Sequence, residues 1–183
     1  MSQEDQIFLN QAKTGDKVAF GKLVEKYYEM VYAVIFGILG NREESLDLAQ
    51  DLFVKVYREL NRFRGDSSFK TWLYRIAVNM AIDLIRKRRP FVPIDEGMEL
   101  PVEKPSPRDQ ASQEELSRFV REALALLSPE HRAILVLREW HDLSYEEIAE
   151  TLRIDLGTVM SRLHYARKKL GEVVLSRFGR IES

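Results

Sequence analysis

Five of the six prolines in this 183-residue chain fall within one short stretch: Pro90, Pro93, Pro101, Pro105 and Pro107. Proline fixes φ and removes a backbone donor, so the stretch cannot continue a regular helix. Residues 91–115 also carry 7 acidic and 2 basic side chains, and their repulsion favours an extended chain. We therefore predict an extended acidic linker with a folded part on either side. A surface loop without a function of its own is the alternative.

On both sides of this stretch, apolar residues recur at intervals of three and four, the spacing of one buried helix face. The stripes run through residues 20–38, 46–60, 73–84 and 116–127. No run alternates as a strand would, and the length suits one ordinary domain or two small ones. We predict an all-α fold of two small helical domains, residues 1–90 and 116–183, joined by the linker 91–115.

Residues that favour helix ends support this interpretation. Gly40 is suited to end one helix, and Ser128 followed by Pro129 is suited to begin another. Further N-cap candidates are Asn41, Ser112 and Ser144, each followed three residues later by glutamate, and Asp155.

Composition narrows the function classes. The chain has no cysteine and three scattered histidines, which argues against disulfides, thiolate zinc sites and cysteine nucleophiles. With no phosphate-binding loop or paired-carboxylate site either, we predict no catalytic residue, no metal and no cofactor. The polar first residues are unlike a secretory signal, and the longest apolar run, 30–39, is about half of what spans a bilayer. We expect a cytoplasmic protein without direct membrane insertion.

Charge is distributed unevenly although the net charge is only −1. Residues 61–90 carry 8 basic and 2 acidic side chains, and residues 153–180 carry 7 and 2. These two basic stretches are separated by the acidic linker, so the near-neutral total conceals two candidate nucleic-acid surfaces.

The second basic stretch has the pattern of a helix-turn-helix. A short amphipathic helix over 144–152 is followed, after a three-residue turn, by another whose inner face begins at Val159. Arg153 stands in the turn where glycine is common. The candidate duplex-DNA contacts are Ser144, Thr158, Ser161, Arg162, His164, Tyr165, Arg167 and Lys168. Thr158 lies in the first turn, where backbone N–H groups favour a phosphate. The alternative is a helical hairpin with a solvated basic face.

The first basic stretch mixes cations with aromatic rings, which suits unpaired bases better than intact duplex. A short polar loop at 64–68 is a candidate to surround a flipped-out base. The candidate contacts are Arg62, Phe63, Arg64, Gly65, Asp66, Ser67, Ser68, Phe69, Lys70, Trp72, Arg75, Asn79 and Arg86. We place Trp72, Arg75, Asn79 and Arg86 on one helix face, opposite the apolar stripe. The alternative is that the aromatic residues are core.

The predicted helix 42–60 has an outer face of carboxylates with one amide: Glu43, Glu44, Asp47, Gln50 and Asp51. Such a face suits docking onto a basic partner. A metal site on this face is disfavoured because no histidine lies nearby. The remaining alternative is that the face is only solvated and binds no partner.

Six short motifs, in this order across the linker, resemble those of extracytoplasmic-function sigma factors of bacterial RNA polymerase. They lie at residues 15–20, 51–57, 63–79, 127–132, 143–149 and 157–163, and the resemblance covers nearly the whole chain. The third reads Phe-Arg-Gly-Asp-Ser-Ser-Phe-Lys-Thr-Trp-Leu-Tyr-Arg-Ile-Ala-Val-Asn.

The resemblance implies core RNA polymerase and promoter DNA as partners. The acidic helix would bind the polymerase β′ clamp, and Phe63, the loop after it and Asn79 would hold a flipped base of the −10 element. The second domain would read the −35 duplex near the β flap. The linker resembles a segment that threads toward the polymerase active site. An anti-sigma factor, which in some relatives holds the protein at the inner membrane, would be a further partner.

Two other function classes remain open at this point. A stand-alone helix-turn-helix regulator would use residues 1–90 for sensing or dimerisation, and tight promoter binding without polymerase would favour it. An enzyme would show turnover that depends on a carboxylate.

Overall fold

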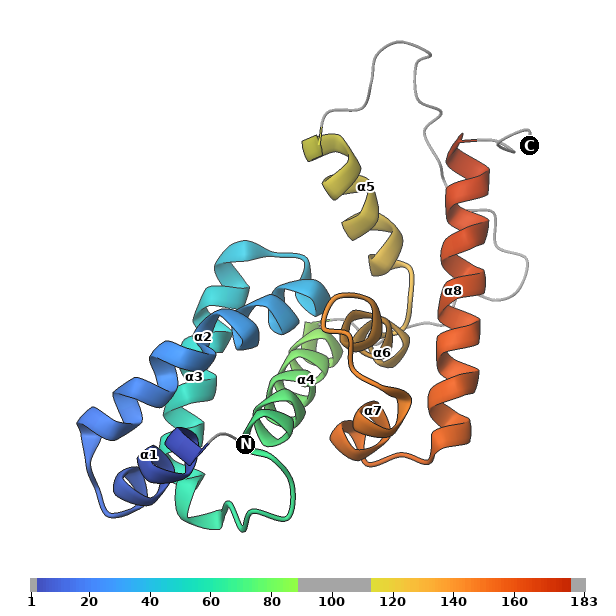
Figure 1. Ribbon diagram of the computed structural model, residues 1–183. Helices are drawn as coiled ribbons and strands as arrows, with labels where there is room; N and C mark the ends of the chain where they lie inside the picture. The colour runs from blue at the N-terminus through green and yellow to red at the C-terminus, as the bar shows by residue number, and fades with distance from the viewer. Residues whose placement is uncertain (1–2, 89–112, 179–183) are drawn as a thin grey trace.

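The computed structural model describes residues 3–88 and 113–178, with side chains described for 3–88 and 118–176. Within these ranges the chain forms eight α-helices, one 3-10 turn and no strand, which confirms the predicted all-α fold (Figure 1). The elements are α1 (Gln3–Lys13), α2 (Lys17–Leu39), α3 (Arg42–Glu59), η1 (Leu60–Arg62), α4 (Phe69–Arg88), α5 (Gln113–Ala125), α6 (Pro129–Glu139), α7 (Tyr145–Leu152) and α8 (Leu156–Phe178). Most of the predicted linker, and the predicted cap Ser112, lie outside the described residues.

The described helix ends follow the capping residues. Gly40 ends α2 in the left-handed conformation, at φ 69°. Asn41 begins α3 by accepting the Glu44 N–H, and Ser128 begins α6 ahead of its first-position proline. At α7, Ser144 and Glu147 form the reciprocal capping box that their spacing predicts.

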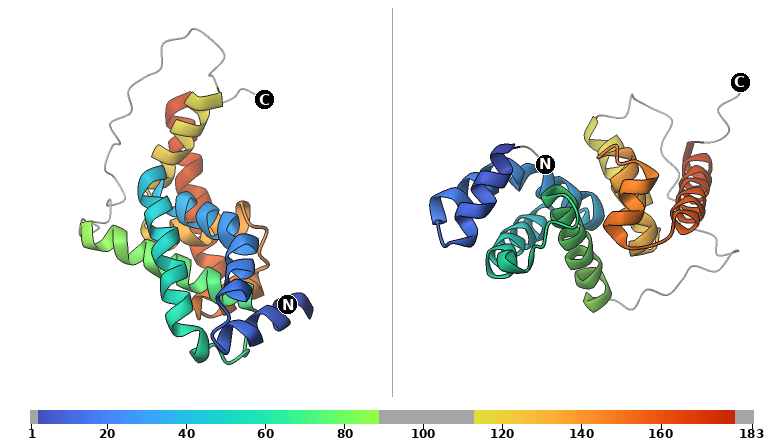
Figure 2. Two further views of the ribbon diagram at one scale, coloured as in Figure 1. Left: turned by 90° about the vertical axis from the view of Figure 1, so that its left-hand side faces the viewer. Right: turned by 60° about the horizontal axis from the view of Figure 1, so that its bottom comes forward.

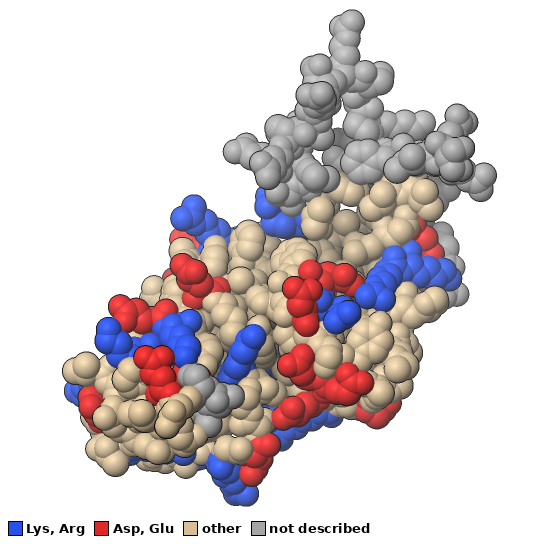
Figure 3. All heavy atoms as spheres, in the orientation of Figure 1, with Lys and Arg blue, Asp and Glu red and all other residues tan. Residues whose placement is uncertain are grey.

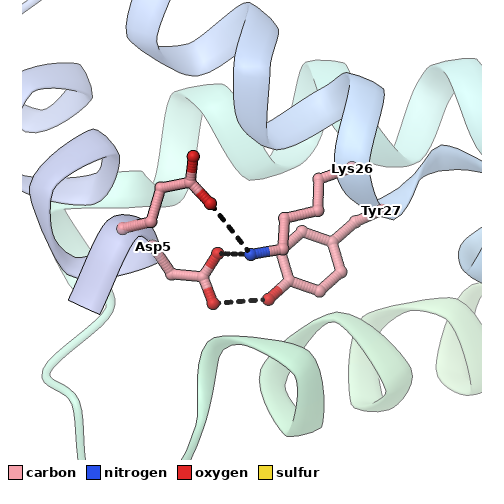
Figure 4. Close-up of polar contacts among 4 residues, drawn as sticks. Asp5, Lys26 and Tyr27 are labelled. Atoms are coloured by element: carbon pink, nitrogen blue, oxygen red, sulfur yellow. Dashed lines mark hydrogen bonds and ion pairs between the residues drawn. The ribbon is translucent and has the colours of Figure 1, made fainter. Parts of the chain in front are cut away.

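The first helix, α1, was not anticipated from periodicity, and a buried carboxylate joins it to α2. Asp5 is only 2% exposed, accepts a hydrogen bond from the Tyr27 hydroxyl at 2.9 Å and pairs with the Lys26 ammonium at 2.5 Å (Figure 4). Burial, and then the hydrogen bond to Asp5, raise the pKa of Tyr27, so its hydroxyl stays protonated and donates. These contacts fix α1 across the middle of α2.

The two halves of the chain, α1–α4 and α5–α8, lie against each other (Figures 1 and 2). Helix α6 packs on α2 and α4, and α7 packs on α4. One continuous apolar cluster includes Ile38 and Ala77 from the first half together with Leu135 and Ile148 from the second. The sequence predicts two helical parts, and the structure adds that they share a core.

Polar and close-packed contacts reinforce this junction. Arg132 of α6 is buried, and its guanidinium donates to the Ile38 carbonyl at the end of α2 at 2.7 Å. The same guanidinium donates to the carbonyl groups of Ala125 and Leu127, which satisfies the end of α5. Gly37 lies directly under Trp140: a Cβ added there would stand 2.6 Å from the indole ring. The absence of a side chain at Gly37 therefore permits the close approach of the halves.

Candidate functional site

Helices α7 and α8 form the predicted helix-turn-helix. Ile148 and Val159 are fully buried between them, and Arg153 and Ile154 turn the chain by donating their backbone N–H groups to Ala149. The backbone of Arg153 is in the left-handed α conformation, at φ 55° and ψ 47°, which glycine adopts more easily than other residues. The turn therefore has the backbone geometry usual with glycine at this position, and the arginine side chain makes that geometry energetically less favourable.

The outer face of α8 presents most of the predicted duplex contacts. Ser161, His164, Tyr165, Arg167 and Lys168 are exposed, and Arg162 is half-buried. Two of these side chains already have partners within the second half. The Arg167 guanidinium pairs with Glu139 of α6 at 2.6 Å, and the Tyr165 ring lies 4.6 Å from the His131 ring, centre to centre.

The predicted phosphate position at the start of α8 is occupied by the protein itself. Asp155 accepts the Thr158 backbone N–H at 2.7 Å and the Thr158 hydroxyl at 2.5 Å. The hydroxyl hydrogen bond, and then that N–H, lower the pKa of Asp155, so the cap is ionised at neutral pH. Thr158 therefore completes a helix cap, and its own N–H is engaged by Asp155; the DNA contact expected at Thr158 stays a prediction.

The aromatic residues of the first basic stretch form a cluster at the start of α4. Phe63 and Phe69 are buried, and their rings lie 5.1 Å and 5.7 Å from the ring of half-buried Trp72. Lys13 of α1 covers this cluster and donates to the Phe63 carbonyl at 2.7 Å. The prediction that these rings are available for stacking is not met by Phe63 and Phe69, which are core in this arrangement.

The polar members of the same stretch divide between solvent and the second half. Arg62, Arg64, Asp66, Lys70 and Asn79 are exposed, as is Gly65 at φ 84°. Ser67 and Ser68 are half-buried, and the Ser68 hydroxyl accepts the Thr71 N–H.

Two predicted DNA contacts have partners in the second half of the chain, although Arg86 itself remains exposed. Arg75 donates to the carbonyl groups of Thr151 and Glu150, and Arg86 pairs with Glu130 at 2.5 Å. Burial, and then the neighbouring Arg153, lower the pKa of Arg75 from its very high ordinary value. The predicted single helix face of Trp72, Arg75, Asn79 and Arg86 is therefore only partly open to solvent.

A pocket of about 510 Å³ lies at this junction. Its lining residues are Arg62, Phe63, Arg64, Gly65, Asp66, Ser67, Trp72 and Arg75 from the first half, with Glu150 and Arg153 from the second. The pocket thus collects most of the predicted single-strand contacts and places the end of α7 among them.

The acidic face of α3 is largely exposed. Glu43, Asp47, Gln50 and Asp51 are open to solvent, whereas Glu44 pairs with Arg88 of α4. Beside this face runs a mainly apolar groove of about 630 Å³ between α2 and α3, which the sequence analysis missed. Its lining residues are Lys17, Phe20, Val24, Tyr28, Gln50, Phe53, Val54, Tyr57 and Arg58. Exposed Val18, Val54 and Tyr57 on these helices are the feature from which it could have been inferred.

Charges of both signs are mixed over the face shown in Figure 3, which has no continuous basic surface. Across residues 3–88 and 113–178, no three His, Asp or Glu side chains are grouped to bind a metal ion. No helix in the same ranges is long and apolar enough to cross a bilayer.

Comparison with known proteins relates each half of the chain to one conserved region. The family model for sigma-70 region 2 matches residues 23–91, and that for sigma-70 region 4 matches residues 119–170. The chain is 35% identical over 172 residues to the ECF RNA polymerase sigma factor SigW of Bacillus subtilis, covering 88% of this chain and 92% of SigW. It is 36% identical to the RNA polymerase sigma-H factor of Pseudomonas aeruginosa, covering 94% of each chain.

Solved structures give the same relationship. CnrH, in complex with the cytosolic domain of CnrY, superimposes with a TM-score of 0.72 at 28% identity, over 95% of this chain and 99% of CnrH. RpoE of Bartonella quintana, in complex with the anti-sigma factor NepR, gives a TM-score of 0.64 at 26% identity, over 85% and 96%. Since the sequence similarity extends along nearly the full length of several relatives, this chain belongs to the extracytoplasmic-function (ECF) family of RNA polymerase sigma factors.

Proposed function

We propose that this chain gives core RNA polymerase its promoter specificity by binding alone, without catalysing a reaction. The observation that carries the proposal is the match of sigma-70 region 2 to the first half of the chain and of sigma-70 region 4 to the second half. This similarity to sigma factors in both halves favours a sigma factor over a stand-alone helix-turn-helix regulator.

Helix α3 supplies the polymerase contact in this proposal. Its exposed carboxylates Glu43, Asp47 and Asp51, with Gln50, offer an acidic patch of the kind that steers a protein onto a basic partner surface. The β′ clamp is the proposed partner, with Glu44 at the edge of the patch. The second half is the proposed partner of the β flap.

DNA is assigned to the two basic stretches. The exposed face of α8 suits the −35 duplex, because a recognition helix presents cations and polar groups to base edges and phosphates. The unpaired −10 strand is assigned to the predicted contacts of the first basic stretch other than the buried Phe63 and Phe69. The proposed functional division is residues 1–90, the linker 91–115 and residues 116–183.

We include an anti-sigma factor among the proposed partners. RpoE is described in complex with the anti-sigma factor NepR, and CnrH in complex with the cytosolic domain of CnrY. The protein would work in the cytoplasm, where polymerase and DNA are. When inactive, it would be held at the inner membrane by an anti-sigma factor anchored in that membrane.

The polymerase contact is tested by Asp51→Lys. Reversing the charge of this exposed residue replaces attraction to a basic clamp with repulsion, and we expect affinity for core polymerase to fall about tenfold, or about 1.4 kcal/mol. Affinity is measured by fluorescence anisotropy with labelled protein, and circular dichroism checks the fold.

Glu29→Lys is the matched control, because it makes the same charge reversal at an exposed position of α2. Equal affinities for Asp51→Lys, Glu29→Lys and the parent chain would remove α3 from the polymerase interface.

A further inference from the structure

The end of α7 occupies a DNA contact that the proposed function assigns to the first half. The Arg75 guanidinium donates through Nε to the Thr151 carbonyl at 3.1 Å and through Nη2 to the Glu150 carbonyl at 3.0 Å. The last carbonyl groups of a helix have no partner within it and carry the negative end of its dipole. They therefore offer Arg75 the oxygen acceptors that a DNA phosphate would otherwise provide.

The same helix end also forms one wall of the pocket. Residues 62–67 with Trp72 and Arg75 line one side, and Glu150 and Arg153 line the other. Glu150 and Arg153 carry opposite charges, so this wall adds no net repulsion of a phosphate. An incoming strand thus meets an arginine whose donors are already engaged and a pocket that the end of α7 closes on one side.

Contacts elsewhere along the junction keep α7 in this position. The Tyr74 hydroxyl of α4 lies 3.4 Å from His141 Nδ1, and the two rings are 5.5 Å apart, centre to centre. Burial raises the pKa of Tyr74 to about 12, so its hydroxyl stays protonated at neutral pH. The Tyr74–His141 contact joins α4 to the second half. The Arg132–Ile38 hydrogen bond and the packing of Trp140 on Gly37 join α2 to the second half.

We propose that the C-terminal end of α7 is an internal competitor of single-stranded promoter DNA. In the isolated chain the last carbonyl groups of α7 accept the hydrogen bonds of Arg75, and the helix end closes one side of the pocket. A strand enters the pocket only after the two halves separate. This inference rests on the proposed function, because it takes the predicted contacts of the first basic stretch other than Phe63 and Phe69 as the strand-binding residues. Polymerase that binds both halves at once and holds them apart would favour separation, which would couple strand capture to assembly.

A reversible cross-link across the junction tests the proposal. The chain has no cysteine, so Tyr74→Cys with His141→Cys adds a single pair, at positions outside the proposed DNA contacts. A disulfide-containing bismaleimide joins the pair, and reduction of the reagent separates it again. The probe is a fluorescein-labelled random single-stranded DNA of about 12 nucleotides, within the site size of one single-strand binding module.

We expect the linked protein to bind the probe at least about tenfold more weakly than the same protein after reduction, a difference of about 1.4 kcal/mol. Equal affinity before and after reduction would overturn the proposal.

A second variant disturbs the junction and leaves every proposed DNA contact unchanged. In Gly37→Leu the new Cβ would stand 2.6 Å from the Trp140 ring and 2.8 Å from Val136, so these side chains must shift and the packing of α6 on α2 is disturbed. Gly21→Leu is the matched control, since it lies on the same helix and its Cβ would meet nothing within 4 Å. We expect Gly37→Leu to bind the probe about fivefold more tightly than Gly21→Leu, or about 1 kcal/mol. Equal binding by the two variants would contradict the competitor role.

Transcription separates the two claims. If the reduced double-cysteine protein and the parent chain both fail to direct core polymerase to any promoter, the proposed function is wrong. If they direct transcription while linked and reduced proteins bind the strand equally, only the competitor role is wrong.

Discussion

Asp5 shows how one side chain fixes a helix that periodicity alone did not predict. Its carboxylate is buried, yet it accepts from Tyr27 and pairs with Lys26, so each oxygen has a partner (Figure 4). A buried carboxylate is tolerated only when it is satisfied in this way.

Replacing Asp5 by alanine should lower the free energy of unfolding by about 1–3 kcal/mol, because the buried Tyr27 hydroxyl then loses its acceptor. Urea denaturation followed by circular dichroism measures the change. Glu4→Ala is the control: that side chain is 67% exposed, and its loss should cost little. Equal losses for the two variants would show that burial of Asp5 is not what stabilises α1.

Side chains whose role is local could be predicted from the sequence. Gly40 and Ser144 act on backbone groups within four residues of themselves, and both predictions are confirmed. Asp5, Arg75 and Arg132 were not predicted in their observed roles, because their partners lie 22, 76 and 94 positions away. Nothing in the spacing of a sequence reports such a distant partner.

At the scale of elements, the helix-turn-helix follows the sequence pattern closely. Its one departure is Arg153, which takes a left-handed conformation where glycine is common. An L-residue in this conformation is strained relative to glycine by about 1–2 kcal/mol, part of which is offset by the greater freedom that glycine loses on folding.

Arg153→Gly should therefore raise the free energy of unfolding by about 0.5–1 kcal/mol. Thermal and urea unfolding measure the gain. Arg153→Ala separates the two contributions, since it removes the same charged side chain but keeps the backbone strain, and it should give no such gain. A loss of stability in Arg153→Gly would mean that the arginine side chain itself stabilises the turn.

The start of α4 shows a second limit of element patterns. Rings that stack on bases and rings that fill a core have the same composition and spacing, so both interpretations of residues 63–72 were open. The structure places Phe63 and Phe69 in the core and leaves Trp72 half-buried at the pocket. The contacts of Phe63 with Phe69 and Trp72, of Tyr27 with Phe69, and of Lys13 with Phe63 decide between the two.

At the scale of the whole molecule, the sequence predicts two helical parts but does not predict their shared core. The apolar stripes on each side of the linker look sufficient for a separate small domain, yet one cluster extends through both halves. Arg75 donates to backbone carbonyl groups and Arg86 pairs with Glu130 across the junction, which weakens the attraction of these two arginines for DNA in the isolated chain.

Run-off transcription with purified core polymerase on a promoter library tests the central claim most directly. The account predicts that the chain directs initiation from a specific subset of templates and that core polymerase alone does not. The selected promoters should share two short elements, one read as duplex and one near the start site read as an unpaired strand. Transcription that is no more selective than that of core polymerase alone would contradict the account.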